Sequence, residues 1–178
     1  MTRPTSYRPL VLGIHPTARG FGWAVMENPL VLHSFGVFHA RGDKNAGCLR
    51  KIRWLLERLE PEQLILEAFD ERSAVKSERI RRLCLSIVDL VATHGSDVKV
   101  FTRLEVQQCF SGVGARSRQE IAEAVARHAP ALRPHLPKKR RAWDSADHRL
   151  SLFGAAALAL AHYHYEATAF LNEMRDAA

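Results

Sequence analysis

The sequence has few of the features that mark disulfide-bonded, zinc-binding or membrane-spanning proteins. Its 178 residues hold only three cysteines, Cys48, Cys84 and Cys109, and none forms a CxxC pair. This spacing indicates neither a zinc site nor a disulfide framework, and we expect reduced thiols inside the core. No apolar run approaches the ~20 residues needed to span a bilayer, and the N-terminus lacks the apolar core of a signal peptide. We therefore expect a cytoplasmic protein that makes no membrane contact.

Acidic residues are also relatively scarce. Lys and Arg number 26 against 19 Asp and Glu, which leaves a formal net charge of +7. A positive potential of this kind favours polyanions, of which nucleic acid is the commonest, although it also serves solubility alone. With 47% hydrophobic residues the chain can bury a sizeable core, so we expect residues 1–178 to form one domain.

The apolar pattern predicts an α/β protein. Three strand-like runs come first with short links, which indicates an antiparallel meander, and two further strands then alternate with helices. This order predicts a five-stranded mixed sheet flanked by helices, as in the ribonuclease H-like fold, although several nucleotide-binding folds share the pattern. The expected strands are 10–14, 23–26, 30–38, 63–66 and 98–101, and the expected helices are 43–60, 73–94, a piece from 103, 117–128 and one from about 144 into the 170s.

Four positions could build a polar site. Glu67 follows three apolar strand residues, so it is expected at the carboxyl edge of the sheet, where α/β proteins collect ligands. Asp144 and Asp147 are three apart at an expected helix start, so their side chains would share one face and could hold a divalent cation. Each acid also has an ordinary explanation, as a helix cap or as a solvated strand-end residue. His15 ends the first strand.

Basic residues gather in three places that suit DNA phosphates. One group lies after Glu67, one follows a glycine loop at 112–114 whose backbone amides could also hold phosphate, and one directly precedes Asp144. A solvated surface is the ordinary explanation of such groups, but the position of the third group next to Asp144 favours phosphate contacts there. Phe69 could stack on a base or could be a core residue. The DNA-binding candidates are Phe69, Arg72, Lys76, Arg79, Gln107, Arg116, Arg118, Lys138, Lys139, Arg140 and Arg141.

Five short motifs resemble, in order, those of the RuvC-type Holliday junction resolvases. Residues 12–16 (LGIHP) resemble the opening LGIDPG of that family, and 22–25 (GWAV) resemble GYGVI. Residues 64–67 (LILE) are similar to the AIEQ strand end, and 106–121 to the segment VKQTVVGIG with its basic helix start. Residues 144–147 (DSAD) resemble the closing DAADALAIA. The resemblance extends from Leu10 to about His162.

The resemblance implies a homodimer that cuts four-way DNA junctions with two Mg²⁺ ions held by four carboxylates. Glu67, Asp144 and Asp147 match three of these carboxylates, whereas His15 matches the fourth in position only. Arg118 matches a basic site that faces DNA. Gln107 stands where the family has Lys, and Phe69 is offset by one residue from the family's aromatic.

His15 determines how the site is interpreted. Mg²⁺ prefers oxygen ligands, so an imidazole should weaken Mg²⁺ binding and favour Mn²⁺ or Zn²⁺. The site could remain active with His15 as ligand or general base, or Asp70 or His148 could fill the gap. His15 could also simply hydrogen-bond Glu67 or Asp144 in a site without metal.

We favour an endodeoxyribonuclease that cleaves branched DNA by two-metal-ion hydrolysis. The alternative is a catalytically impaired relative that binds branched DNA without cutting it. A nucleotide-binding protein of the sugar-kinase or actin type would need a second domain, for which 178 residues leave no room.

Overall fold

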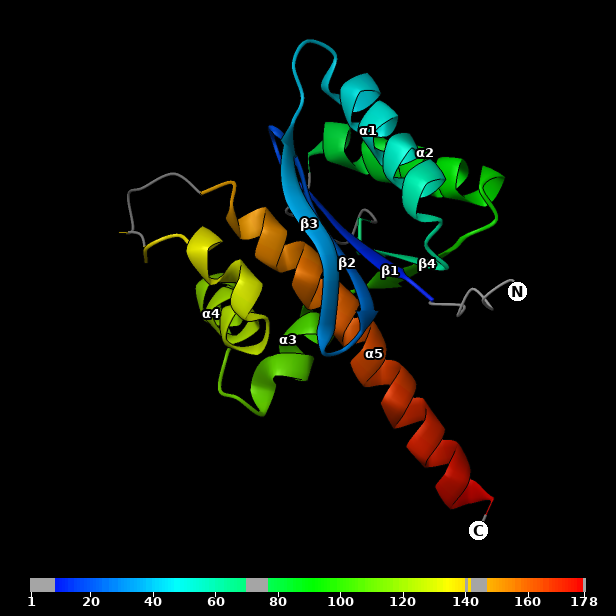
Figure 1. Cartoon of the computed structure of the whole chain (residues 1–178), viewed down its shortest axis with the longest axis vertical. Helices are drawn as coiled ribbons and strands as arrows, with labels where there is room; N and C mark the ends of the chain where they lie inside the picture. The colour runs from blue at the N-terminus through cyan, green and yellow to red at the C-terminus, as the bar shows by residue number, and fades with distance from the viewer. Residues whose placement is uncertain (1–8, 70–76, 140, 142–146, 178) are drawn as a thin grey trace, which may run out of the picture.

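The computed structural model describes residues 9–69, 77–139, 141 and 147–177, and it confirms the predicted α/β architecture (Figure 1). The sheet has five strands in the order β3-β2-β1-β4-β5. The first three form the expected antiparallel meander, and β1 pairs in parallel with β4, which pairs in parallel with β5. Their bounds are β1 Val11–Pro16, β2 Gly20–Asn28, β3 Val31–His39, β4 Gln63–Glu67 and β5 Asp97–Phe101.

Helices cover both faces of the sheet. On one face lie α1 (Lys44–Leu59) and α2 (Glu78–Thr93), and on the other lie α3 (Arg103–Ser111), α4 (Arg118–His128) and α5 (Leu150–Asp176) (Figure 1). A 3₁₀ helix, Pro130–His135, follows α4 within the proline-rich stretch, and the sequence pattern did not predict it.

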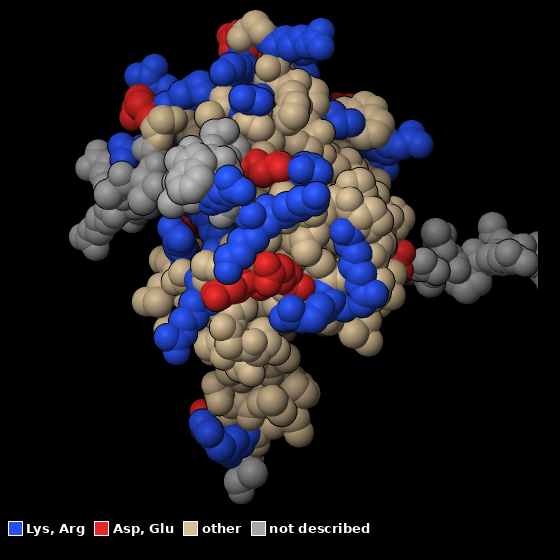
Figure 2. Space-filling view, turned by 90° about the vertical axis from the view of Figure 1, so that its left-hand side faces the viewer, with Lys and Arg blue, Asp and Glu red and all other residues tan. Residues whose placement is uncertain are grey.

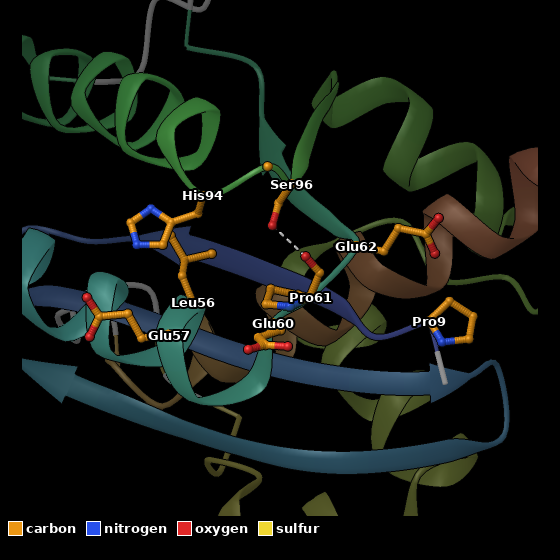
Figure 3. Close-up of a pocket in the computed structure, with 9 residues that line it drawn as sticks. Pro9, Leu56, Glu57, Glu60, Pro61, Glu62, His94 and Ser96 are labelled. Carbon is orange, nitrogen blue, oxygen red and sulfur yellow. Dashed lines mark hydrogen bonds between the residues drawn. The ribbon is translucent and has the colours of Figure 1, made fainter. Parts of the chain in front are cut away.

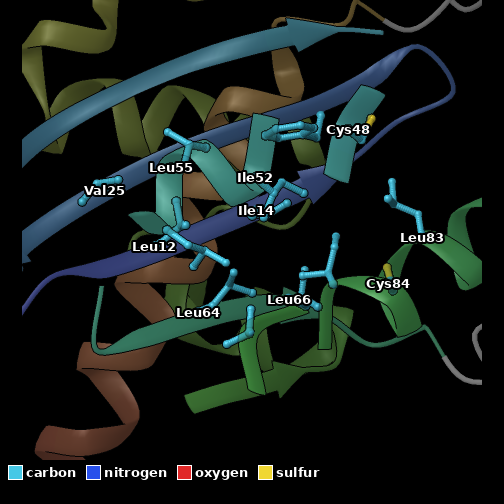
Figure 4. Close-up of a cluster of buried hydrophobic side chains, with 14 residues drawn as sticks. Leu12, Ile14, Val25, Cys48, Ile52, Leu55, Leu64, Leu66, Leu83 and Cys84 are labelled. Carbon is cyan, nitrogen blue, oxygen red and sulfur yellow. The ribbon is translucent and has the colours of Figure 1, made fainter. Parts of the chain in front are cut away.

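Alternation along the central strands sorts their side chains between the two helical layers. Leu12 and Ile14 of β1 join Leu64 and Leu66 of β4 in a buried cluster with α1 and α2 (Figure 4). The intervening residues of β1 and β4 therefore face α5. Among them are the last polar residues of the two strands, His15 and Glu67.

The apolar side of α2 belongs to this core. Leu83, Cys84, Ile87 and Val91 are fully buried, so this side of the helix packs against the protein's own interior. The helix also begins later than residue 73. Ser77 has extended backbone and its side chain accepts a hydrogen bond from the Ile80 amide, so Glu78 is the first helical residue. Residues 73–76 lie outside the described residues.

The last helix starts at Leu150, and not near residue 144 as the sequence predicted. Residues 147–149 form a turn before it, in which the Leu150 amide donates to the carbonyl of Asp147. The helix then continues beyond the sheet to Asp176, where Phe170, Leu171 and Met174 are each more than half exposed (Figure 1). In the described part of the chain, no helix has the length and hydropathy to cross a membrane.

Candidate functional site

The ends of β1 and β4 bring His15 and Glu67 together. Ile14 pairs with Leu66 in the parallel register, so the next residue of each strand lies beside the other. His15 Nε2 lies 3.3 Å from Glu67 Oε2, and the two side chains are only 18% and 15% exposed. The other ring nitrogen, Nδ1, is buried without a hydrogen-bond partner among the residues that the structure describes. His15 and Glu67 therefore form a largely enclosed imidazole–carboxylate pair.

The first turns of α5 lie unusually close to this pair because glycines remove the intervening side chains. A Cβ atom on Gly13 would lie 2.0 Å from the Ala155 carbonyl oxygen, and one on Gly22 would lie 2.2 Å from the Ser151 carbonyl carbon. Both distances are far below van der Waals contact. Glycine at these two positions lets the helix backbone rest directly on the strands.

Gly154 of α5 faces His15 itself. A Cβ atom at this position would lie 2.6 Å from Cδ2 and 2.9 Å from Cγ of the imidazole. Ser151, three residues earlier and on the same helix face, packs against Gly22, which is the β2 partner of His15. Ser151 and Gly154 are therefore α5 positions that lie against the strand ends, and neither was a candidate from the sequence.

Asp147 lies outside the helix and is paired with a neighbour. Its carboxylate accepts hydrogen bonds from the Arg149 amide at 2.8 Å and from Nη2 of the Arg149 guanidinium at 2.7 Å. The Arg149 guanidinium lowers the pKa of the Asp147 carboxyl. The expectation that Asp144 and Asp147 share one face of the last helix does not hold, because the helix starts three residues after Asp147. Asp144 lies outside the described residues.

His148 is also engaged elsewhere. Its ring packs edge-on against that of His39, with 5.5 Å between the centroids. Burial and the nearby Arg19 guanidinium both lower the pKa of the His148 imidazole. Asp70, the other residue considered to fill the gap, lies outside the described residues.

These side chains do not fit a site for two Mg²⁺ ions. Across the described ranges, no three His, Cys, Asp or Glu side chains lie together in a way that could hold a metal ion. Glu67 is the described carboxylate at the junction of β1, β4 and α5, and its neighbour is an imidazole. Such a donor set suits a borderline ion such as Zn²⁺ or Mn²⁺ better than Mg²⁺, and it is incomplete even for those.

Three of the residues predicted to bind DNA make contacts within the chain. The Arg79 guanidinium donates to the Thr17 carbonyl at 2.7 Å and to Asn45 Oδ1 at 2.8 Å, which fastens α2 to α1 and to the β1–β2 turn. Gln107 Nε2 donates to the Arg116 carbonyl at 2.9 Å. Phe69 is half-buried and packs on the core cluster beneath α1 and α2.

The remaining described candidates are exposed: Arg116, Arg118, Lys138, Lys139 and Arg141. Figure 2, which shows the side of the molecule on which α4 lies in Figure 1, has many Lys and Arg side chains around a smaller acidic group. Arg72, Lys76 and Arg140 lie outside the described residues.

The glycine loop does not present free amides for a phosphate. The amides of Val113 and Ala115 donate to the Phe110 carbonyl, and that of Gly114 donates to the Ser111 carbonyl. The amides of residues 116 and 117 donate to Glu120 Oε2, and these bonds lower the pKa of the Glu120 carboxyl. The loop is a closed connection between α3 and α4 that exposes arginine side chains at its end.

A hollow at the opposite edge of the sheet, where β1, β4 and β5 begin, is unsuited to DNA (Figure 3). Its lining includes the exposed acids Glu57, Glu60 and Glu62, which would repel phosphates. The polar site and the basic side chains are therefore the better candidates for function.

Comparison with solved structures identifies the fold. RuvC from Thermus thermophilus in complex with a Holliday junction substrate superposes with a TM-score of 0.67 at 19% identity, over 90% of this chain and 96% of that one. A second structure of Thermus thermophilus RuvC gives 0.65, also at 19% identity and with the same coverage. The yeast mitochondrial Holliday junction resolvase Ydc2 gives 0.51 at 13% identity, over 98% of this chain and 87% of that one. Neither a protein-family profile nor a curated protein matches the sequence. The chain thus has the RuvC fold, as the motifs predicted.

Proposed function

We propose that this chain recognises branched DNA, in particular four-way junctions. The observation that carries the proposal is the agreement of the fold over nearly the whole of both chains with a RuvC bound to a Holliday junction. The net charge of +7 supports a polyanionic partner.

The start of α4 is the strongest described candidate for the phosphate contacts. Arg116 and Arg118 flank Ser117, which caps the helix, and both arginines are exposed. A helix N-terminus adds its positive dipole end to the two guanidinium charges. Lys138 and Lys139 are exposed as well and follow the 3₁₀ helix.

The test is a competition between a synthetic four-way junction and linear duplexes of the same arm sequences, measured by fluorescence anisotropy in EDTA. We expect the junction to bind more tightly than the duplexes. The variant Arg116→Ala/Arg118→Ala should lower the slope of log K against log salt by about 0.9 per lost phosphate contact. The control Arg50→Ala/Arg53→Ala removes the same charge from exposed positions on α1, across the sheet, and should keep that slope. Equal affinity for junction and duplex would contradict the proposal.

Strand cleavage is the second candidate function. The resolvase fold and the carboxylate of Glu67 at the edge of the central strands favour it. Incubation of a labelled junction with the protein in Mg²⁺ and then in Mn²⁺ tests it, with Glu67→Gln as the control. Scission that Glu67→Gln abolishes would establish a nuclease, whereas binding without scission in either ion would leave recognition as the function.

The homodimer that the resemblance implies stays a prediction. Light scattering coupled to size-exclusion chromatography, with and without junction DNA, measures the mass against the 20.1 kDa of one chain.

A further inference from the structure

The space between the end of β1 and the first turns of α5 is filled by protein. The imidazole of His15 lies where a side chain on Gly154 would have to go, with 2.6 Å between the imaginary Cβ and the ring. Glu67 also contacts the ring, with its Oε2 3.3 Å from Nε2. The large side chain of His15 on β1 thus packs against a glycine of α5, which has no side chain.

The α5 positions that face this space supply little to a cation. Ser151 and Gly154 have the three-residue spacing that an acid pair on the first turns would need. Gly154 has no donor atom, and the Ser151 hydroxyl donates to the His148 carbonyl at 2.6 Å. Asp147, three residues before the helix, is bound by Arg149. Among the described groups at the strand ends, Glu67 is thus the carboxylate that could still bind a cation, and its neighbour is the His15 imidazole.

We infer that this chain engages branched DNA without a divalent cation, because the His15 ring fills the place between β1 and α5 that metal ligands would need. The inference rests on the proposed function and specifies it as recognition without metal-dependent cleavage. The residues at positions 15, 151 and 154 together determine that no metal ion is bound: His15 fills the space, and Ser151 and Gly154 supply no carboxylate. Glu67 stays as the partner of the imidazole.

The test compares the wild-type protein with the variant His15→Asp/Ser151→Asp/Gly154→Asp. The variant replaces the ring by a shorter acid and places two carboxylates on the helix face opposite it. Both proteins are measured for Mn²⁺ binding by electron paramagnetic resonance, and for junction affinity and scission in EDTA and in MnCl₂ at equal ionic strength. Circular dichroism confirms that each is folded.

For the wild-type protein, we expect one junction Kd in both buffers, intact strands and no Mn²⁺ bound in excess of a bovine albumin blank. The folded variant should gain Mn²⁺ binding. Scission by the wild type in MnCl₂, or a junction Kd that falls on adding Mn²⁺, would overturn the inference. If Asp144→Asn then abolished that scission, Asp144 would be the acid that completes the metal site.

A folded variant that gains no Mn²⁺ would also overturn the inference, because the three positions would then not share a cation site. If the variant does not fold, the wild-type measurements decide alone. Absence of junction binding in both buffers would instead refute the proposed function.

Discussion

The contact between His15 and Gly154 can be measured as a coupling energy. In the wild-type background, Gly154→Ala places a methyl group 2.6 Å from the imidazole. Overpacking of this kind costs about 1–3 kcal/mol, which is offset by the gain of about 1 kcal/mol for replacing glycine by alanine inside a helix. The ring cannot easily move aside, because Glu67 holds Nε2 and Nδ1 is buried. We therefore expect a net loss of up to about 2 kcal/mol in the free energy of unfolding.

In a His15→Ala background the obstacle is gone, and the same Gly154→Ala change should stabilise the protein by about 1 kcal/mol. The coupling energy between the two positions should then be about 1–3 kcal/mol. Urea unfolding of the four proteins, followed by far-ultraviolet circular dichroism, gives this value if the m-values agree.

The matched control is Gly112→Ala, since a Cβ on Gly112 meets nothing within 4 Å. Its effect should add to that of His15→Ala within about 0.5 kcal/mol. If the effects of Gly154→Ala and His15→Ala also added within about 0.5 kcal/mol, the imidazole would not fill the space over the helix.

Three further predictions concern single side chains. Arg79→Ala should lower the free energy of unfolding by about 1.5–3 kcal/mol, because two charge-assisted hydrogen bonds to Thr17 and Asn45 are lost, and chemical denaturation measures this. Arg149→Ala should raise the pKa of Asp147 towards its ordinary value, seen by NMR titration, while stability at pH 7 should change little because the pair is partly exposed. The lowered pKa means that this small contribution is present above the unfolded-state pKa and is lost as the pH falls through the folded-state value. Burial raises the pKa of Tyr163 to about 12, so absorbance at about 295 nm should show its ionisation later than that of an ordinary tyrosine, whose pKa is about 10. Stability from this raised pKa should be lost as the pH rises from the unfolded-state value through 12, and Tyr163→Phe should lose less over the same range.

The sheet could be predicted from the sequence because its strands are short apolar runs bounded by glycine, proline or charge. The run before Glu67 and the paired glycines before Trp23 gave both the meander and the parallel strand that follows it. The ends of the helices were harder to predict from the sequence. Ser77 starts α2 by capping it, yet a polar residue inside an apolar periodicity is easily assigned to the helix that it begins.

The start of the last helix was misplaced for a physical reason that the sequence does contain. In the family motif DAADALAIA, the alanine-rich run follows the second acid directly. In this chain, residues 148–154 separate Asp147 from the run that starts at Ala155. These residues form a turn and the first turns of α5, so the helix face towards His15 carries Ser151 and Gly154. The register of a helix against a strand depends on where the helix starts, and a four-residue motif does not determine that start.

Glu67 has an explanation that needs no metal. An imidazole in a nearly closed site needs an acceptor for its N–H group, and the Glu67 carboxylate lies 3.3 Å from Nε2. Glu67→Gln keeps a carbonyl acceptor, whereas Glu67→Leu leaves the ring nitrogen without one at a cost of about 1–3 kcal/mol.

If Glu67 serves His15, thermal unfolding should show a melting temperature for Glu67→Leu that is clearly below that of Glu67→Gln, by about 2–4 °C per kcal/mol for a chain of this size. When the same two substitutions are made in a protein that also carries His15→Leu, their melting temperatures should no longer differ. If Glu67 did not serve His15, Glu67→Leu and Glu67→Gln would give the same melting temperature in the wild-type background, and that result would refute the role assigned to Glu67.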